Sequence, residues 1–225
     1  MKKLIILLVL IKMTTLSLFA NGVAITNITK GHNLRLISST VEVSVENQIA
    51  ITKTTQTFKN ETDSTVSIQY GFPLKDGESA IQLRWFIDDM WYLANIGAKP
   101  DSGGGGVPKD IASKYEQYLG ETPLMFKIDQ ELPETEEITI ELQYVTLLPY
   151  NFGKVTYSYS NNYDLIQTSP LLSQYLNFQI LSERTIEELT LLSHSATESD
   201  NDGNFAYIEY ITYESLATTD YSLEY

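Results

Sequence analysis

Apolar and polar residues alternate with a period of two over most of the chain. The segment VEVSVE at 41–46 is the clearest case, because glutamate and serine separate its three valines. Successive side chains of a strand point to opposite faces, so this pattern predicts a strand with one buried face. Similar patterns predict strands at 49–58, 65–72, 81–87, 124–128, 137–147, 155–159, 176–181, 185–192 and 205–213. Many short strands separated by turn residues predict an all-β fold, either an antiparallel β-sandwich or a distorted barrel.

One segment departs from this period. Ile111, Ala112, Tyr115, Tyr118 and Leu119 recur at a spacing of three to four residues, with Pro108 ahead of them and Gly120 behind. This spacing predicts one short amphipathic helix at about 108–119. The glycine run at 102–106 comes before it, and this run lacks the Lys-Ser/Thr pair of a phosphate-binding loop.

The first twenty residues resemble a secretory signal peptide. Lys2 and Lys3 precede an apolar run at 4–11, and the segment ends with Leu18-Phe19-Ala20, after which cleavage is expected. An uncleaved membrane anchor is the alternative, but Lys12 interrupts a stretch that would need about 20 apolar residues. The sequence therefore predicts a leader at 1–20 and a secreted, periplasmic or cell-surface protein, with no membrane span after cleavage.

Composition excludes several classes of function. The chain carries 29 acidic and 15 basic residues, for a net charge of −14, which disfavours nucleic-acid binding. It has no cysteine and only two histidines, so disulfides, thiolate zinc sites and cysteine nucleophiles are absent from the sequence. The sequence has no Gly-x-Ser-x-Gly motif, so His194 is not expected to belong to a Ser-His-Asp triad. The glutamates at 131–137 are typical of a solvated sheet edge rather than of an acid–base pair. We therefore expect no enzymatic activity.

A series of short motifs follows in a characteristic order. A strand ends in Q-x-F-x-N, the next ends in Y-x-F-P, an A-x-x-Y helix ends in glycine, and a later strand ends in tyrosine. The residues are Gln56, Phe58, Asn60, Tyr70, Phe72, Pro73, Ala112, Tyr115, Gly120 and Tyr144. Over about residues 34–150 this order resembles the vault protein inter-alpha-trypsin (VIT) domain.

The resemblance implies a division of the chain and a function. A VIT-like β domain would occupy 21–150, and residues 151–225 would add strands that pack on it and lead toward a following domain. The family places its VIT domain beside a von Willebrand type A domain, which implies a surface module that mediates protein–protein contacts and scaffolds that neighbour. An isolated chain should then expose an apolar patch near 221–225. The chain has no Asp-x-Ser-x-Ser segment, so the family's metal-dependent adhesion is not carried over.

Two other sites are compatible with the sequence. The segment ESDNDGNFAYIE at 198–209 places Glu198, Asp200, Asp202, Asn204 and Glu209 at spacings found in calcium loops, so Ca²⁺ is a candidate cofactor. The same Asp-Asn-Asp-Gly run is also strong turn chemistry, which favours a polar hairpin.

The alternative function is a secreted carbohydrate-binding module. Trp91 and Tyr92 could stack on sugar rings, whereas alternation places Trp85 in the core. Neighbours in a strand point to opposite faces, so one of Trp91 and Tyr92 should be exposed, and the sequence leaves open which one.

Overall fold

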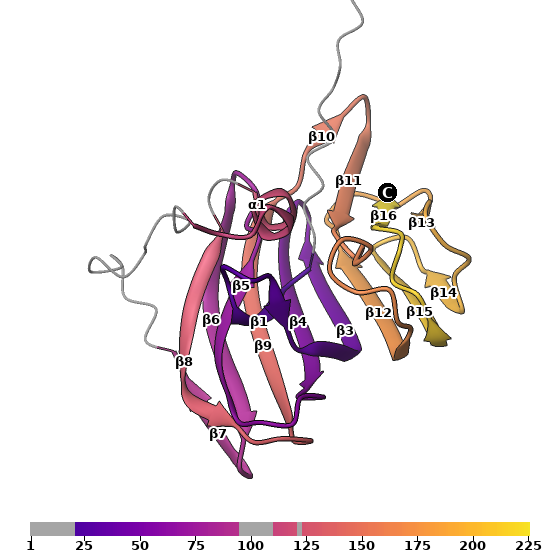
Figure 1. The fold of residues 1–225 in the computed structure, drawn as a ribbon. Coiled ribbons are helices and arrows are strands. Elements are labelled where there is room, and N and C mark those ends of the chain that lie inside the picture. The colour runs from indigo at the N-terminus through magenta and orange to yellow at the C-terminus, as the bar shows by residue number, and fades with distance from the viewer. Residues whose placement is uncertain (1–20, 95–109, 121–122) are drawn as a thin grey trace, which may run out of the picture.

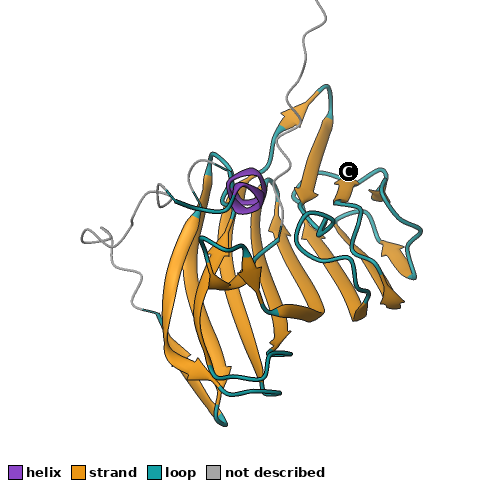
Figure 2. Cartoon of the chain, in the orientation of Figure 1, coloured by secondary structure: helices purple, strands orange, loops and turns teal. Residues whose placement is uncertain are grey.

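The computed structural model describes residues 21–94, 110–120 and 123–225. This part of the chain contains sixteen strands and one short helix (Figure 2). The strands form three open sheets, and two smaller sheets pack on one face of the largest. The all-β prediction is therefore confirmed, and the sandwich is the correct alternative. The predicted leader, the glycine run at 102–106 and Pro108 lie outside the described residues.

The largest sheet has eight strands and forms one complete layer. Its order is β14 (Glu198–Asn201), β15 (Phe205–Ser215), β12 (Leu171–Leu181), β3 (Arg35–Glu46), β4 (Ile49–Lys59), β9 (Glu137–Leu147), β6 (Glu78–Ile87) and β7 (Met90–Leu93). β12 pairs in parallel with β3, whereas the other described pairs are antiparallel. Residues 171–215 therefore extend the same sheet that residues 35–147 build.

Two four-stranded sheets cover one face of this layer (Figure 1). One has the order β2 (His32–Asn33), β1 (Val23–Asn27), β5 (Val66–Phe72) and β8 (Leu124–Leu132). The other has the order β10 (Tyr150–Asn151), β11 (Lys154–Tyr159), β16 (Tyr221–Glu224) and β13 (Thr190–Leu191). The ring of Phe72 lies 5.6 Å from that of Tyr144, and the ring of Tyr157 lies 5.4 Å from that of Phe178. Each small sheet thus packs on a different half of the large one.

The helix α1 (Ser113–Leu119) is shorter than predicted. Ala112 is extended, and its N–H donates to the carbonyl of Ile28 at 2.9 Å, so the helix begins at Ser113. Gly120 ends it in the left-handed region at φ 72°, a conformation that glycine adopts without steric cost. Among the described residues, no helix has the length and apolar character needed to cross a bilayer.

Three expectations at the strand level need correction. Only Thr190–Leu191 of the predicted strand 185–192 is a strand, because the backbone of Ile186 is bonded to the β14–β15 turn instead. β1, which the alternation did not predict, pairs with β5. The apolar patch expected near 221–225 is wrong for Tyr221 and Leu223, which are buried because β16 lies between β11 and β13.

The core follows from the alternation. Ile138, Ile140 and Leu142 of β9 are fully buried, whereas the residues that alternate with them, Thr139, Glu141 and Gln143, face outward. β9 lies between β4 and β6, so side chains of both neighbouring strands flank its inward side chains, and the covering sheet packs on top of them.

Replacing Leu142 by alanine should lower the free energy of unfolding by about 2–5 kcal/mol, because a fully buried leucine leaves a cavity. Gln143→Ala is the matched control on the outward face and should change stability by less than about 0.5 kcal/mol. Urea unfolding followed by tryptophan fluorescence measures both. Equal effects of the two substitutions would show that this face of β9 is not the packed one.

Candidate functional site

The inward face of β4 is polar where the two small sheets meet. Ala50 and Phe58 near its ends are buried, and so are Thr52, Thr54 and Gln56 between them. Alternation turns the apolar Ile49 and Ile51 to the outer face instead. Buried polar groups are costly unless they are hydrogen-bonded, so this stretch of β4 requires polar partners from the covering sheets.

Gln56 makes the central contacts of this junction. Its side-chain amide donates to the carbonyl of Gly22 at 3.0 Å and to the hydroxyl of Tyr163, and its Oε1 accepts from the hydroxyl of Tyr70 at 2.7 Å. The Tyr163 hydroxyl in turn donates to the Gly22 carbonyl. One side chain therefore connects β4 to β5, to the start of β1 and to the segment after β11.

Asn21 extends the network toward β3. Its Nδ2 donates to Ser39 Oγ at 3.2 Å, and its Oδ1 accepts from the Tyr159 hydroxyl and from the N–H of Gly22 at 2.9 Å. The Tyr159 hydroxyl also bonds Thr54 Oγ1 at 2.9 Å. Since that hydroxyl gives its one proton to Asn21, Thr54 must be the donor.

Residue 22 must be glycine because there is no room for a side chain, and not because its backbone angles require glycine. A Cβ at this position would lie 2.0 Å from the Tyr70 hydroxyl oxygen and 2.4 Å from Gln56 Oε1. Both distances are far below contact distance, so any larger residue would displace the network. We name this network and the neighbouring pair Thr52 and Tyr157, whose hydroxyls are bonded at 3.1 Å, the polar junction. Its members are Asn21, Gly22, Thr52, Thr54, Gln56, Tyr70, Tyr157, Tyr159 and Tyr163.

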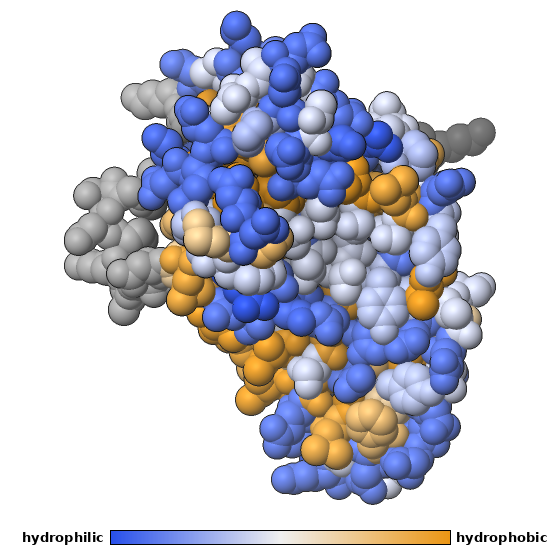
Figure 3. Space-filling view, turned by 90° about the horizontal axis from the view of Figure 1, so that it is seen from below, coloured by the Kyte–Doolittle hydropathy of each residue, from blue (hydrophilic) through white to orange (hydrophobic). Residues whose placement is uncertain are grey.

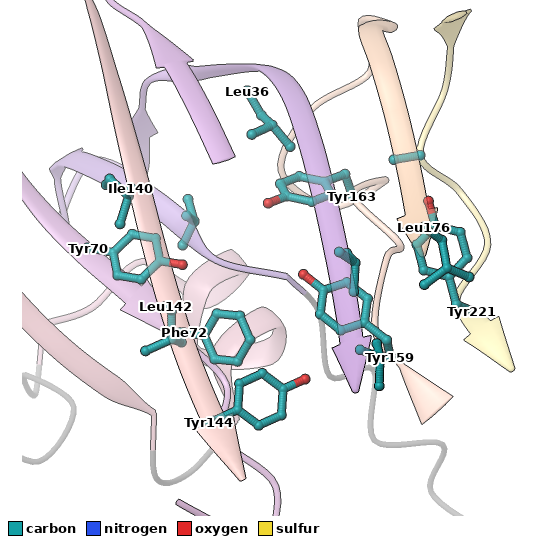
Figure 4. Close-up of a cluster of buried hydrophobic side chains, with 14 of the residues drawn as sticks. Leu36, Tyr70, Phe72, Ile140, Leu142, Tyr144, Tyr159, Tyr163, Leu176 and Tyr221 are labelled. Carbon is teal, nitrogen blue, oxygen red and sulfur yellow. The ribbon is translucent and has the colours of Figure 1, made fainter. Parts of the chain in front are cut away.

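The tyrosines of the polar junction are held neutral. Burial raises the pKa of Tyr70 and Tyr159 above the ordinary range of a phenol, and it does the same for Tyr163. Figure 4 shows that these three rings extend from different parts of the chain into one buried cluster. A phenol that resists ionisation is a weak nucleophile and base, so the arrangement suits structural hydrogen bonding rather than catalysis.

Asn60 ties two loops to the end of β4. Its Nδ2 donates to the carbonyls of Ser64, Leu132 and Pro133 at 2.9–3.1 Å, and its Oδ1 accepts from the N–H of Thr62 at 3.0 Å. Every hydrogen-bonding direction of the buried amide is used. The asparagine of the Q-x-F-x-N motif is thus a clamp between the loop after β4 and the turn before β9.

The other motif residues also have structural positions. Phe58, Phe72, Pro73 and Tyr144 are buried between the layers. Tyr115 donates its hydroxyl proton to Asn33 Oδ1 at 3.1 Å, which docks α1 against β2. Ala112 and Gly120 bound the helix. The structure therefore brings most of the motif residues into one interior, and none of them lines an open cleft.

Trp91 and Tyr92 lie on opposite faces of β7. Trp91 is 47% exposed, and the guanidinium carbon of Arg84 stands 4.3 Å from its ring centroid. Tyr92 is half-buried and stacks on the core residue Trp85 at 5.9 Å. Trp91 is therefore the exposed one, with one ring face covered by Arg84.

The five candidate calcium residues lie along a β-hairpin. Glu198 and Glu209 are paired across β14 and β15, whereas Asp202 and Asn204 lie at the turn. Asp202 Oδ1 accepts from the N–H of Phe205 at 2.8 Å, and Glu209 Oε1 accepts from Tyr175 and Asn177 at 2.8 Å. Within residues 21–94, 110–120 and 123–225, no three acidic or histidine side chains are grouped closely enough to hold a metal ion. Calcium binding at Glu198, Asp200, Asp202, Asn204 and Glu209 stays a prediction.

His194 lies in an aromatic cluster. Its ring centroid is 4.5 Å from that of Tyr210 and 5.1 Å from that of Tyr221, and Nδ1 bonds Ser193 Oγ at 2.8 Å. Partial burial lowers the pKa of His194. These contacts describe a structural histidine at the base of β16.

Most of the polar junction was not singled out from the sequence, because its other members carry no recognisable motif. These are Asn21, Gly22, Thr52, Thr54, Tyr157, Tyr159 and Tyr163. The available signal was the alternation itself. If Ala50 and Phe58 face inward, the residues between them with the same parity must face inward too, and they are polar.

Comparison with known proteins points to one family and one fold. Residues 36–144 match the family model of the vault protein inter-alpha-trypsin domain. No curated protein matches the chain.

Solved structures show the fold. A crystal structure of a proposed nutrient-binding protein from Legionella pneumophila has a TM-score of 0.59 at 13% identity and covers 92% of this chain and 70% of that one. An M1 zinc metallopeptidase from Deinococcus radiodurans has a TM-score of 0.45 at 7% identity and covers 84% of this chain and 42% of that one. The chain thus spans less than half of the metallopeptidase. At these identities the first similarity shows the shared architecture alone.

Replacing Gln56 by leucine should lower the free energy of unfolding by about 1–3 kcal/mol, because it leaves the buried Tyr70 hydroxyl without its acceptor, whereas the Tyr163 hydroxyl and the Gly22 carbonyl keep their bond to each other. Gln143→Leu makes the same chemical change on the outward face of β9 and should have a small effect. Denaturant unfolding measures both. A Gln56→Leu protein as stable as the control would mean that the junction contributes nothing.

Stability should fall as the pH rises above about 10, the pKa of tyrosine in an unfolded chain. The folded-state pKa of Tyr70, Tyr144 and Tyr159 is raised, so the unfolded chain releases these protons first. The contribution is therefore complete below pH 10 and is lost above it, by about 1.4 kcal/mol per pH unit for each such tyrosine. Phenolate absorbance and circular dichroism should change together for these residues. Ionisation of all tyrosines near pH 10 with the fold intact would contradict this.

Proposed function

Residues 36–144 are a vault protein inter-alpha-trypsin domain, and from this premise we propose that the protein is an exported, non-enzymatic β module that works through protein–protein contacts. The leader pattern at 1–20 supports export. The family motifs lie in the interior, where they support the fold, so the binding chemistry has to come from the surface.

The surface observation that carries the proposal is a row of exposed apolar side chains. Leu181, Ile49 and Leu147 are 55%, 53% and 72% exposed and lie on the outer face of the large sheet. The register places them in one line across the strands, with Glu46 between Leu181 and Ile49. We call these three residues the apolar strip. Exposed apolar residues that gather on one face among polar ones are typical of interaction sites.

Apolar residues also reach the surface elsewhere. In the view from below, they form patches separated by polar residues (Figure 3). The apolar strip differs in being an ordered row on a rigid sheet, which makes it a preformed surface. A neighbouring von Willebrand type A domain is the partner that we propose to test first.

The alternative is a secreted carbohydrate-binding module. The exposed ring of Trp91 favours it, since an exposed indole can stack on a sugar. Arg84 covers one face of that ring, so a sugar would have to use the other face.

Leu147→Glu should reduce capture of a protein partner from the exported proteins of the source organism by about tenfold or more, because it places a charge in the apolar strip. Gln143→Glu is the matched control on the same face of β9 and should leave capture unchanged. Quantitative mass spectrometry of proteins retained by the immobilised chain measures both. Retention of glycans that Trp91→Ala abolishes, with no protein retained, would favour the carbohydrate-binding alternative.

A further inference from the structure

An open groove of about 900 Å³ lies beside the C-terminus. The hairpin of β10 and β11 forms one wall and projects beyond the other described strands (Figure 1). Residues 182–190 form the other wall, and Tyr225 and the turn at Asn47 lie between the two. The Tyr225 hydroxyl donates to the carbonyl of Asn47 at 2.8 Å, which fixes the ring in place.

The wall at 182–190 has little regular structure but is held firmly. The N–H of Ser182 donates to the carbonyl of Asn204 at 2.8 Å, and Asn204 Nδ2 donates back to the Ser182 carbonyl at 2.8 Å. Asn201 Nδ2 donates to the carbonyl of Ile186 at 3.0 Å, and the N–H of Glu183 donates to Asn47 Oδ1 at 3.0 Å. Asn201 and Asn204 of the β14–β15 hairpin thus hold this wall in place. This structural role is independent of any calcium binding by the hairpin.

Phe152 stands at the tip of the opposite wall. Phe152 and Gly153 are the two loop residues of the hairpin, with φ of 52° and 90°. Such a turn strongly favours Asn-Gly, and a bulky residue at positive φ is an outlier. The Phe152 side chain is also fully exposed and packs against nothing in the described chain. Folding gains nothing from a phenylalanine at this position, and a binding contact would explain it.

The charge of the groove indicates what it takes. Its lining contains four glutamates and two basic residues, and one of these, Lys154, is already paired with Glu224. Glu183, Glu187 and Glu188 are exposed along the wall. This wall and the aromatic rings of Tyr150, Phe152 and Tyr225 together suit a basic and partly apolar ligand, because carboxylates and aromatic faces both attract cations.

We propose that the groove binds an extended segment of a partner protein in which basic residues alternate with apolar ones. The basic side chains lie along the glutamates of 182–190, and the apolar side chains contact Phe152 and Tyr225. The groove adjoins the apolar strip, because Asn47 and Gln48 connect directly to Ile49 and Ser182 follows Leu181. The inference rests on the proposed function and names its surface and the chemistry of its partner.

The probe is a fluorescein-labelled synthetic peptide in which lysine alternates with leucine, added to the full chain and followed by fluorescence anisotropy. We expect binding in the micromolar range that weakens about tenfold or more as salt rises to ~0.5 M. A peptide with glutamate in place of lysine should not bind. Equal binding of the two peptides, or no binding of the lysine peptide, would overturn the proposal.

The decisive variant is Phe152→Asn. It restores the Asn-Gly turn, so the melting temperature should stay the same or rise, while binding of the lysine peptide weakens about tenfold or more. Tyr213→Thr removes another exposed aromatic ring, 69% exposed, at the far end of β15 and should leave binding unchanged. Unchanged binding by Phe152→Asn, or an equal loss in both variants, would show that the peptide binds elsewhere.

Failure of the groove can be separated from failure of the proposed function. Partner capture that depends on Leu147 but not on Phe152, together with peptide binding that ignores Phe152, would leave the protein-contact function standing and remove the groove. Capture that is lost equally in Phe152→Asn and Leu147→Glu would support one continuous surface.

Discussion

The hydrogen bonds of the polar junction fix how the three sheets meet. Gln56 lies on the buried face of the large sheet and bonds Tyr70 of β5, Gly22 before β1 and Tyr163 after β11. Tyr159 of β11 adds bonds to Thr54 of β4 and to Asn21. A buried amide is stable only when its partners are in place, so the positions of these segments depend on one another. The large sheet and both four-stranded sheets therefore share one interior.

This constraint commits the polar groups at the centre of the described chain to structural hydrogen bonds and leaves exposed apolar side chains at its margins. The tyrosines of the polar junction are kept neutral by burial, and the family motif residues are used for packing and loop clamping. The outer face of the large sheet and the tip of the β10–β11 hairpin do not contribute side chains to this packing. Their exposed apolar and aromatic side chains, Leu147 and Phe152 among them, are consequently available for contacts.

Much of the fold could be predicted from local patterns, and most of the candidate surface could not. The period of two predicts most strands of the large sheet, but not β14, and the motif order resembles that of the family whose model matches residues 36–144. The sequence did not reveal the parallel pairing of β12 with β3, because register between distant strands leaves no local signal. Nor did it reveal the groove, whose walls come from residues 150–155 and 182–190 and meet only in the folded chain. The segment at 185–192 has the local pattern of a strand. Its Ile186 is instead bonded to Asn201 and Gly203, and such tertiary bonds leave no local signal in the sequence.

Native-state hydrogen exchange at increasing denaturant tests most directly whether the polar junction unites the sheets. One amide from each sheet is sufficient: Thr54 in β4, Tyr70 in β5 and Tyr159 in β11. The account predicts that all three exchange through the same global opening, with equal free energies of opening. A Tyr159 amide that exchanges at a clearly lower free energy than that of Thr54 would show that the C-terminal sheet opens alone, and would contradict a shared interior.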